Sequence, residues 1–188
     1  MLAVFTGPVR SGKSSAALAL ALESGRRVVI AVGGRADDEE MERRIAGHQA
    51  GRPAGIEVIE TPDNPEWLAR VPADACLLVD CLGTILGAEL EAAGAFEADL
   101  VSADSEAAAM AKAEELSRLL LAREAPTVVV TNEVGWGVVP AHPSGRLFRD
   151  VVGRANRTLI DRADAAWLVV GGRLIDLTSL SKEAQWPR

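Results

Sequence analysis

The feature that most constrains this chain is the segment Gly7-Pro8-Val9-Arg10-Ser11-Gly12-Lys13-Ser14, which fits the pattern G-x-x-x-x-G-K-S/T. A short apolar run (residues 2–6) precedes it, and a segment rich in strong helix formers (residues 15–22) follows it. A glycine loop between a strand and a helix binds phosphate well, because backbone N–H groups and the positive end of the helix dipole attract an anion. The segment therefore predicts nucleoside triphosphate binding; the alternative is a plain glycine turn whose lysine is merely solvated.

Each residue type in this loop has a defined task. Gly7 and Gly12 allow turns that a Cβ atom would block. Lys13 is expected to reach the β- and γ-phosphates, and the Ser14 hydroxyl to ligate Mg²⁺. We therefore predict that the whole loop binds the nucleotide and that Lys13 takes part in catalysis.

The composition excludes several other classes of protein. A formal net charge of −7 argues against a nucleic-acid surface, so any phosphate site is local. No basic leader precedes the first apolar run, and the longest apolar helical segment (residues 16–22) is too short to span a bilayer. We expect a single cytoplasmic domain over residues 1–188, with Cys76 and Cys81 as free thiols, no nucleic-acid partner and no membrane span.

Apolar runs of strand type alternate with helical patterns along the chain. Further strands are expected at residues 26–32, 56–60, 76–80 and 127–131, with a closing strand pair at 167–170 and 174–177. Helices are expected at residues 36–50, 83–90, 103–123 and 146–163. This alternation predicts an α/β fold of the P-loop NTPase (RecA-like) type, with a mostly parallel sheet and helices on both faces. Ligands on such sheets bind beyond the carboxyl ends of the strands, where the glycine loop, Asp80 and Asn132-Glu133 converge.

Two acids stand at expected strand ends. Asp80 ends an apolar run and has the position of an acid that holds Mg²⁺ directly or through water. The alternative is that it caps the helix that follows. Glu133 is a candidate to orient or deprotonate an attacking hydroxyl, or to hold Mg²⁺ through water. The alternative is that its segment only shapes the following loop through Gly135 and Gly137.

His48 lies near the end of the expected helix at residues 36–50. Arg44 is four residues earlier and shares its helical face, and Arg52 continues in the same direction. Neighbouring cations disfavour imidazolium, which leaves a neutral nucleophilic nitrogen, and arginines hold a triphosphate well. The pattern suits a histidine that attacks phosphorus, but spacing alone leaves open a surface histidine at a helix C-terminus.

Several blocks in order along the chain resemble the bifunctional adenosylcobinamide kinase / adenosylcobinamide-phosphate guanylyltransferase family of cobalamin biosynthesis. The blocks are Thr6-Gly7 with Arg10-Ser11-Gly12-Lys13-Ser14; Asp38, Glu40-Met41, Arg43/Arg44-Ile45, His48 and Arg52-Pro53; Asp80-Cys81-Leu82; Thr131-Asn132-Glu133-Val134-Gly135 with Gly137-Val138-Val139-Pro140; Arg146-Leu147-Phe148-Arg149-Asp150, Gly153-Arg154 and Asn156; and Ala163-Asp164.

The resemblance implies two reactions. A nucleoside triphosphate, ATP or GTP, phosphorylates a hydroxyl of adenosylcobinamide, a corrinoid. GTP then guanylylates His48, which passes GMP to the corrinoid phosphate. The resemblance also implies Mg²⁺, held here by Ser14 and Asp80, and a homotrimer. Beyond the glycine loop, we predict that the nucleotide-binding residues are Val32, Gly33, Gly34, Arg44, Gln49, Ala50, Gly51, Arg52, Glu60 and Asp80.

Two other hypotheses remain open at the level of sequence. One is a P-loop small-molecule kinase or ATPase without a covalent step, in which His48 is incidental. The other is a nucleotide-binding regulatory module with slow or absent turnover. Lys13, Asp80 and Glu133 suit all three hypotheses, and only the block around His48 separates the first from the others.

Overall fold

The computed structural model describes residues 1–33, 55–61, 65–92, 94 and 102–183. The strands are β1 (Leu2–Thr6), β2 (Val28–Val32), β3 (Glu57–Glu60), β4 (Cys76–Asp80), β5 (Thr127–Val130), β6 (Ala165–Val170) and β7 (Arg173–Asp176). The helices are α1 (Lys13–Glu23), the 3₁₀ helix η1 (Pro65–Arg70), α3 (Leu82–Ala92), α4 (Ala103–Leu121) and α5 (Pro143–Arg162).

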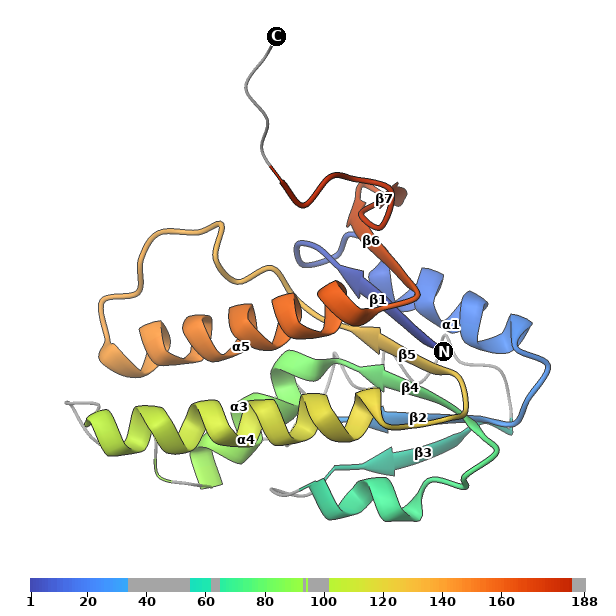
Figure 1. Cartoon of the computed structure of the whole chain (residues 1–188), viewed down its shortest axis with the longest axis horizontal. Coiled ribbons are helices and arrows are strands. Elements are labelled where there is room, and N and C mark those ends of the chain that lie inside the picture. The colour runs from blue at the N-terminus through green and yellow to red at the C-terminus, as the bar shows by residue number, and fades with distance from the viewer. Residues whose placement is uncertain (34–54, 62–64, 93, 95–101, 184–188) are drawn as a thin grey trace, which may run out of the picture.

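One seven-stranded sheet, in the order β3-β2-β4-β5-β1-β6-β7, runs through the molecule (Figure 1). Its pairs are parallel except for β6 and β7, which form an antiparallel hairpin. Strand β5 lies between β1 and β4, so that Val129 pairs with Val4 on one side and with Val79 on the other. The carboxyl ends of β1, β5 and β4 therefore meet at one edge of the sheet.

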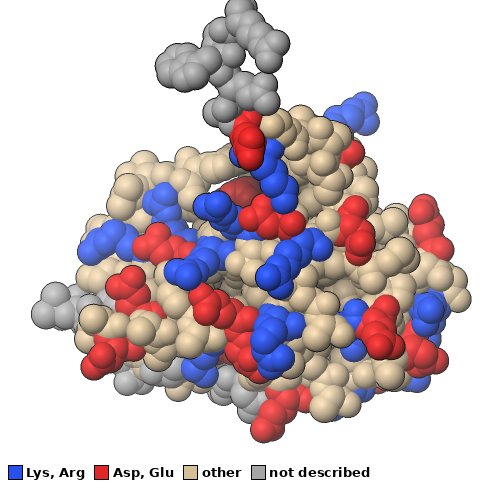
Figure 2. Space-filling view, viewed as in Figure 1, with Lys and Arg blue, Asp and Glu red and all other residues tan. Residues whose placement is uncertain are grey.

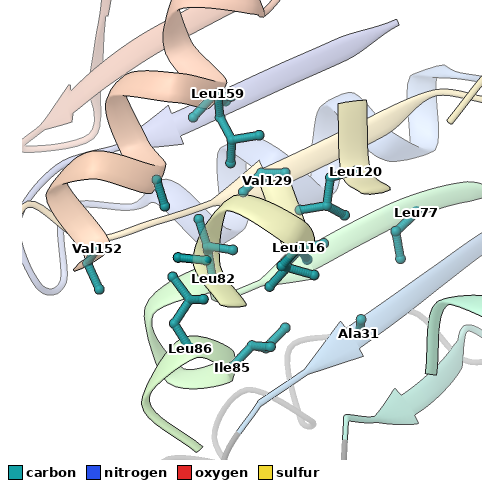
Figure 3. Close-up of a cluster of buried hydrophobic side chains, with 14 of the residues drawn as sticks. Ala31, Leu77, Leu82, Ile85, Leu86, Leu116, Leu120, Val129, Val152 and Leu159 are labelled. Carbon is teal, nitrogen blue, oxygen red and sulfur yellow. The ribbon is translucent and has the colours of Figure 1, made fainter. Parts of the chain in front are cut away.

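Helices cover both faces of the sheet. Helix α1 packs on one face, over a buried cluster that includes Phe5, Ile30 and Leu78. Helices α3, α4 and α5 pack on the other face, where α4 and α5 lie side by side. Figure 3 shows the core of this second face, in which Leu82, Leu116 and Leu159 from the three helices meet strand residues. Alternate strand residues belong to the two clusters, as the period of a strand buried on both sides requires.

The structure confirms the strands expected at residues 2–6 and 76–80 and the closing strand pair, and it corrects several bounds. Helix α5 begins at Pro143 rather than at residue 146, because a proline suits the first helical turn. Strand β2 begins at Val28, β5 ends at Val130, and α4 ends at Leu121. The helix expected at residues 36–50 lies outside the described residues.

Charges of both signs are mixed on the face of the molecule seen in Figure 2, where basic side chains alternate with acidic ones. Within the described parts of the chain, none of the helices combines the length and the apolar character that crossing a membrane requires.

Glu89 is an unusual core residue on α3, because its side chain is charged by nature and only 2% exposed. Its Oε1 atom has no hydrogen-bond partner among the described residues. Burial raises the pKa of this carboxyl from the ordinary 4.5 to about 7, and the positive charge of Lys112 opposes that rise. Between these two pH values the folded protein binds the proton more tightly than the unfolded chain, so the free energy of unfolding falls as pH rises.

We expect Glu89→Gln to remove this part of the pH dependence, because glutamine fills the same volume without ionising. The two proteins should differ little near pH 5, and above pH 7 the variant should have a free energy of unfolding higher by up to about 3 kcal/mol. Urea denaturation across this pH range measures the difference. Glu91→Gln, at an exposed position of the same helix, is the control. An unaltered pH dependence in Glu89→Gln would contradict the prediction.

Candidate active site

The phosphate loop connects β1 to α1 and is built against the β6–β7 hairpin. A Cβ atom at Gly7 would lie 2.3 Å from the carbonyl oxygen of Val169, so only glycine fits there. From the turn of the hairpin, the amide of Gly172 donates to the carbonyl of Ser11 at 2.9 Å. Gly12, with φ 97°, is the N-cap of α1 and offers no side chain to the first helical turn. The N-terminal amides of α1 thus remain available to an anion.

Lys13 is buried within this loop. Its side chain is 6% exposed, and its Nζ donates to the carbonyl of Pro8 at 2.7 Å. Burial lowers the pKa of the ammonium group, while the nearby Cys81 and Asp80 act in the opposite direction. The hydroxyl of Ser11 is also buried and has no partner among the described residues. Buried donors of this kind gain the most from a ligand that brings acceptor oxygens, as a triphosphate does.

The side chain of Ser14, in the first turn of α1, contacts that of Asp80, the last residue of β4. The Ser14 hydroxyl donates to Asp80 Oδ1 at 3.0 Å, although the two residues are 66 positions apart in sequence. A hydroxyl oxygen and a carboxylate oxygen side by side are ligands of the hard type that Mg²⁺ prefers. The residues present therefore fit the magnesium ion that the sequence implied.

Glu133 lies on the same edge, beyond the end of β5. Its Oε1 accepts a hydrogen bond from the Thr6 hydroxyl at 2.8 Å, and its amide donates to the carbonyl of Gly7 at 3.3 Å. Both contacts join it to β1 and to the first residue of the phosphate loop. A carboxylate held beside the loop that binds the γ-phosphate is suitably placed to act on an acceptor group.

A buried polar network supports this edge from α5. Asn156 is 4% exposed, and its Oδ1 accepts from the Thr131 hydroxyl at 2.6 Å while its Nδ2 donates to the carbonyl of Asn132 at 3.0 Å. The side-chain nitrogen of Asn132, Nδ2, in turn lies 3.6 Å from the sulfur of Cys81, the residue that follows Asp80. The network links the ends of β5 and β4, the strands that carry the two acids, and every member is hydrogen-bonded, as a buried network requires.

The connection from β5 to α5 carries an exposed apolar loop. Arg149 donates to the carbonyls of Gly135 and Val138, and Arg146 donates to those of Pro140 and Ala141. These bonds fix the backbone of the loop on the first turns of α5. Large apolar side chains nevertheless remain exposed on it, namely Trp136, Val138 and Val139.

The remaining predicted nucleotide-binding residues fall into two groups. Val32 and Glu60 pair in register at the ends of β2 and β3, and Gly33 packs against Ile85 of α3 so closely that a Cβ atom would lie 2.5 Å from its amide nitrogen. These three residues lie at the carboxyl ends of the strands, as the phosphate loop does. Strands β4 and β5 separate them from β1. Outside the described residues lie Gly34, Arg44, His48, Gln49, Ala50, Gly51 and Arg52.

Sequence reasoning assigned no role to several residues that the structure places at this edge. Thr6 contacts Glu133, Asn156 anchors the network, and Gly172 holds the phosphate loop. The signal for Asn156 was available, because it is a polar residue on the apolar face of α5 between Val152 and Leu159. Thr6 belongs to the first block of the family resemblance, but no local pattern indicated its contact or that of Gly172, since their partners are distant in sequence.

The strand order, the glycine loop and the acids at the carboxyl edge define a nucleotide-binding α/β protein of the P-loop NTPase class. Within that class the chain belongs to one family. The family model described as cobinamide kinase / cobinamide phosphate guanyltransferase matches residues 3–177, nearly the whole chain.

Three relatives are proteins of adenosylcobalamin biosynthesis. The chain is 38% identical over 177 residues to the bifunctional protein CobU of Salmonella typhimurium, covering 92% of this chain and 97% of the relative. It is 36% identical to CobU of Escherichia coli, with the same coverage. It is 34% identical over 168 residues to CobP of Pseudomonas aeruginosa, covering 88% of this chain and 91% of the relative. These matches confirm the family resemblance and the expectation of a bifunctional kinase and guanylyltransferase.

Two solved structures with a similar fold are ATPases. A type III secretion system ATPase from pathogenic bacteria aligns with TM-score 0.52 at 14% identity, covering 89% of this chain and 50% of that one. The ATPase EscN of enteropathogenic E. coli aligns with TM-score 0.51 at 15% identity, covering 90% of this chain and 43% of that one. This chain spans about half the length of these ATPases, and at such identity the likeness concerns the fold alone. The expected P-loop NTPase fold is confirmed.

We expect Lys13→Ala to lower the rate of the kinase reaction by at least ~10²-fold, because the transferred phosphoryl group is stabilised mainly by positive charge around it. Initial rates of corrinoid phosphorylation measure the effect. Lys182→Ala, which removes a surface lysine near Asp161, is the control and should retain the full rate. A folded Lys13→Ala protein with full kinase activity would rule out the assigned role.

Proposed function

We propose that the edge formed by β1, β5 and β4 carries out the kinase step, in which a hydroxyl of adenosylcobinamide attacks the γ-phosphorus of ATP or GTP. The observation that carries the proposal is the meeting of Lys13, the Ser14–Asp80 pair and Glu133 on this edge. The new bond joins the hydroxyl oxygen to the γ-phosphorus, and the bond to the bridging oxygen of the nucleoside diphosphate breaks.

Each residue has a separate role in this step. Glu133 accepts the proton of the attacking hydroxyl, which becomes more acidic as its oxygen bonds to phosphorus. Lys13 and the amides of the phosphate loop bind the β- and γ-phosphates and offset the charge that moves onto the leaving diphosphate. Ser14 and Asp80 would hold Mg²⁺, whose chemistry is to neutralise phosphate charge and fix the orientation of the phosphates.

We propose that His48 carries the guanylyl transfer. Its neutral nitrogen attacks the α-phosphorus of GTP, pyrophosphate leaves, and a phosphoramidate forms. An oxygen of the corrinoid phosphate then attacks the same phosphorus, the bond to His48 breaks, and adenosylcobinamide-GDP results. The support is the helical spacing of Arg44 and His48, with Arg52 continuing the face, in a chain of this family.

The proposal also covers the remaining nucleotide-binding residues, the oligomeric state and the location of the protein. Nucleotide binding extends to the residues at the ends of β2 and β3 and to Gly34, Arg44, Gln49, Ala50, Gly51 and Arg52. We further propose a homo-oligomer, a trimer by resemblance, located in the cytoplasm. An assembly is supported by the large apolar side chains that one protomer leaves exposed, Trp136 and Val138 among them. Light scattering after size-exclusion chromatography tests the oligomeric state.

We expect His48→Asn to abolish covalent labelling by α-labelled GTP, because asparagine offers no nucleophilic ring nitrogen. Phosphorylation of the corrinoid should largely survive, since Lys13 and Ser14 are unchanged. Acid-labile, base-stable label in denatured wild-type protein measures the intermediate. His142→Asn is the matched control, because His142 is the only other histidine of the chain. Retention of label in His48→Asn would move the nucleophile elsewhere.

We expect Asp80→Asn to raise the Mg²⁺ concentration needed for the half-maximal kinase rate, because an amide oxygen binds the cation more weakly than a carboxylate. Titration of the initial rate with Mg²⁺ measures this shift, and thermal unfolding monitors the fold. An unchanged Mg²⁺ requirement together with a lower melting temperature would instead support a helix-capping role for Asp80.

A further inference from the structure

We propose that Thr6 is a positioning residue for the kinase step, which acts by holding Glu133 through its hydroxyl. This inference rests on the proposed function of Glu133 as the group that accepts the proton of the attacking hydroxyl. Thr6 itself would touch neither the nucleotide nor the corrinoid. Its effect on the rate would pass entirely through the carboxylate that it contacts.

The geometry joins Glu133 to β1 at two adjacent points. Thr6 is the last residue of β1, is 2% exposed and donates to Glu133 Oε1 at 2.8 Å. The amide of Glu133 donates to the carbonyl of Gly7, the next residue along the chain. One contact fixes the backbone of Glu133 and the other fixes the end of its side chain. Since the phosphate loop begins at Gly7, both contacts hold the acid in a constant relation to that loop.

The hydrogen bond from Thr6 also leaves the Glu133 carboxylate able to accept a proton from a substrate. An ionised carboxylate only accepts hydrogen bonds, so the Thr6 hydroxyl must supply the proton of this bond. Among the described residues, no hydrogen bond engages the second oxygen, Glu133 Oε2. That oxygen is free to meet an acceptor hydroxyl.

Position matters for such a base, because its effect requires hydrogen-bond distance to the reacting group. A glutamate side chain rotates about several bonds, and ordering it costs side-chain entropy. Because Thr6 already holds the Glu133 side chain in the free protein, that entropy is lost before the substrates bind. The competing reading is structural: a buried hydroxyl needs an acceptor, and Glu133 merely provides one. The two readings predict different kinetics.

Thr6→Val removes the hydroxyl and keeps the shape of the side chain. Thr127→Val is the matched control, because Thr127 is 2% exposed on neighbouring β5, and its hydroxyl contacts only the carbonyl of Ala125 among the described residues. We expect Thr6→Val to lower kcat of the kinase reaction roughly 10-fold with little change in KM for the nucleotide. Thr127→Val should keep kcat, and Thr6→Ser should restore most of it. If Thr6→Val does not fold, Thr6→Ala takes its place in the comparison with Thr6→Ser.

A double-mutant cycle with Glu133→Gln decides how Thr6 acts. If Thr6 works through Glu133, Thr6→Val has almost no further effect on kcat in the Glu133→Gln background. An equal loss in both backgrounds, or a normal kcat in Thr6→Val itself, would overturn the inference while leaving the role of Glu133 intact. A normal kcat in Glu133→Gln would overturn the proposed role of Glu133, and this inference with it.

Discussion

The candidate active site at the carboxyl ends of β4, β5 and β1 depends above all on the parallel pairing of these three strands. Val130 of β5 pairs with Phe5 on one side and with Asp80 on the other, so the register of two ladders sets how far each strand end projects. A slip of one residue would turn every side chain of a strand to the opposite face, where it would not fit the residues packed there. Burial of both faces therefore fixes the register, and the register brings Ser14 to Asp80 and Thr6 to Glu133.

The sequence allowed the strands and the class of fold to be predicted, because short apolar runs between breakers are distinctive. The run at residues 76–80 and the strand–loop–helix at the N-terminus illustrate this. The order of the strands was not predictable. No local pattern says that β5 separates β1 from β4, since that arrangement results from packing between distant segments. The start of α5 was misplaced because the proline-rich loop was extended past Pro143, a residue that begins helices well.

The candidate site was likewise predictable only in part. Lys13, Ser14, Asp80 and Glu133 were predictable, because strand ends and glycine loops mark functional positions along the chain itself. Their partners were not. The alternatives for Asp80 differ only in what its carboxylate touches, and the contact with Ser14 spans 66 residues. The same holds for Thr6, whose role follows from a hydroxyl that faces another strand.

The antiparallel hairpin at the end of the chain explains how the phosphate loop keeps its shape. Gly7 packs on the carbonyl of Val169, and the turn residue Gly172 donates to Ser11, so β6 and its turn contact both ends of the loop. A loop fixed in this way holds its donors in place before the ligand arrives, which is what electrostatic stabilisation of phosphoryl transfer requires. The cost is a buried ammonium and a Ser11 hydroxyl that has no hydrogen-bond partner in the described part of the chain. Because a triphosphate supplies acceptors to these groups only in the folded state, nucleotide binding and the stability of this edge are thermodynamically linked.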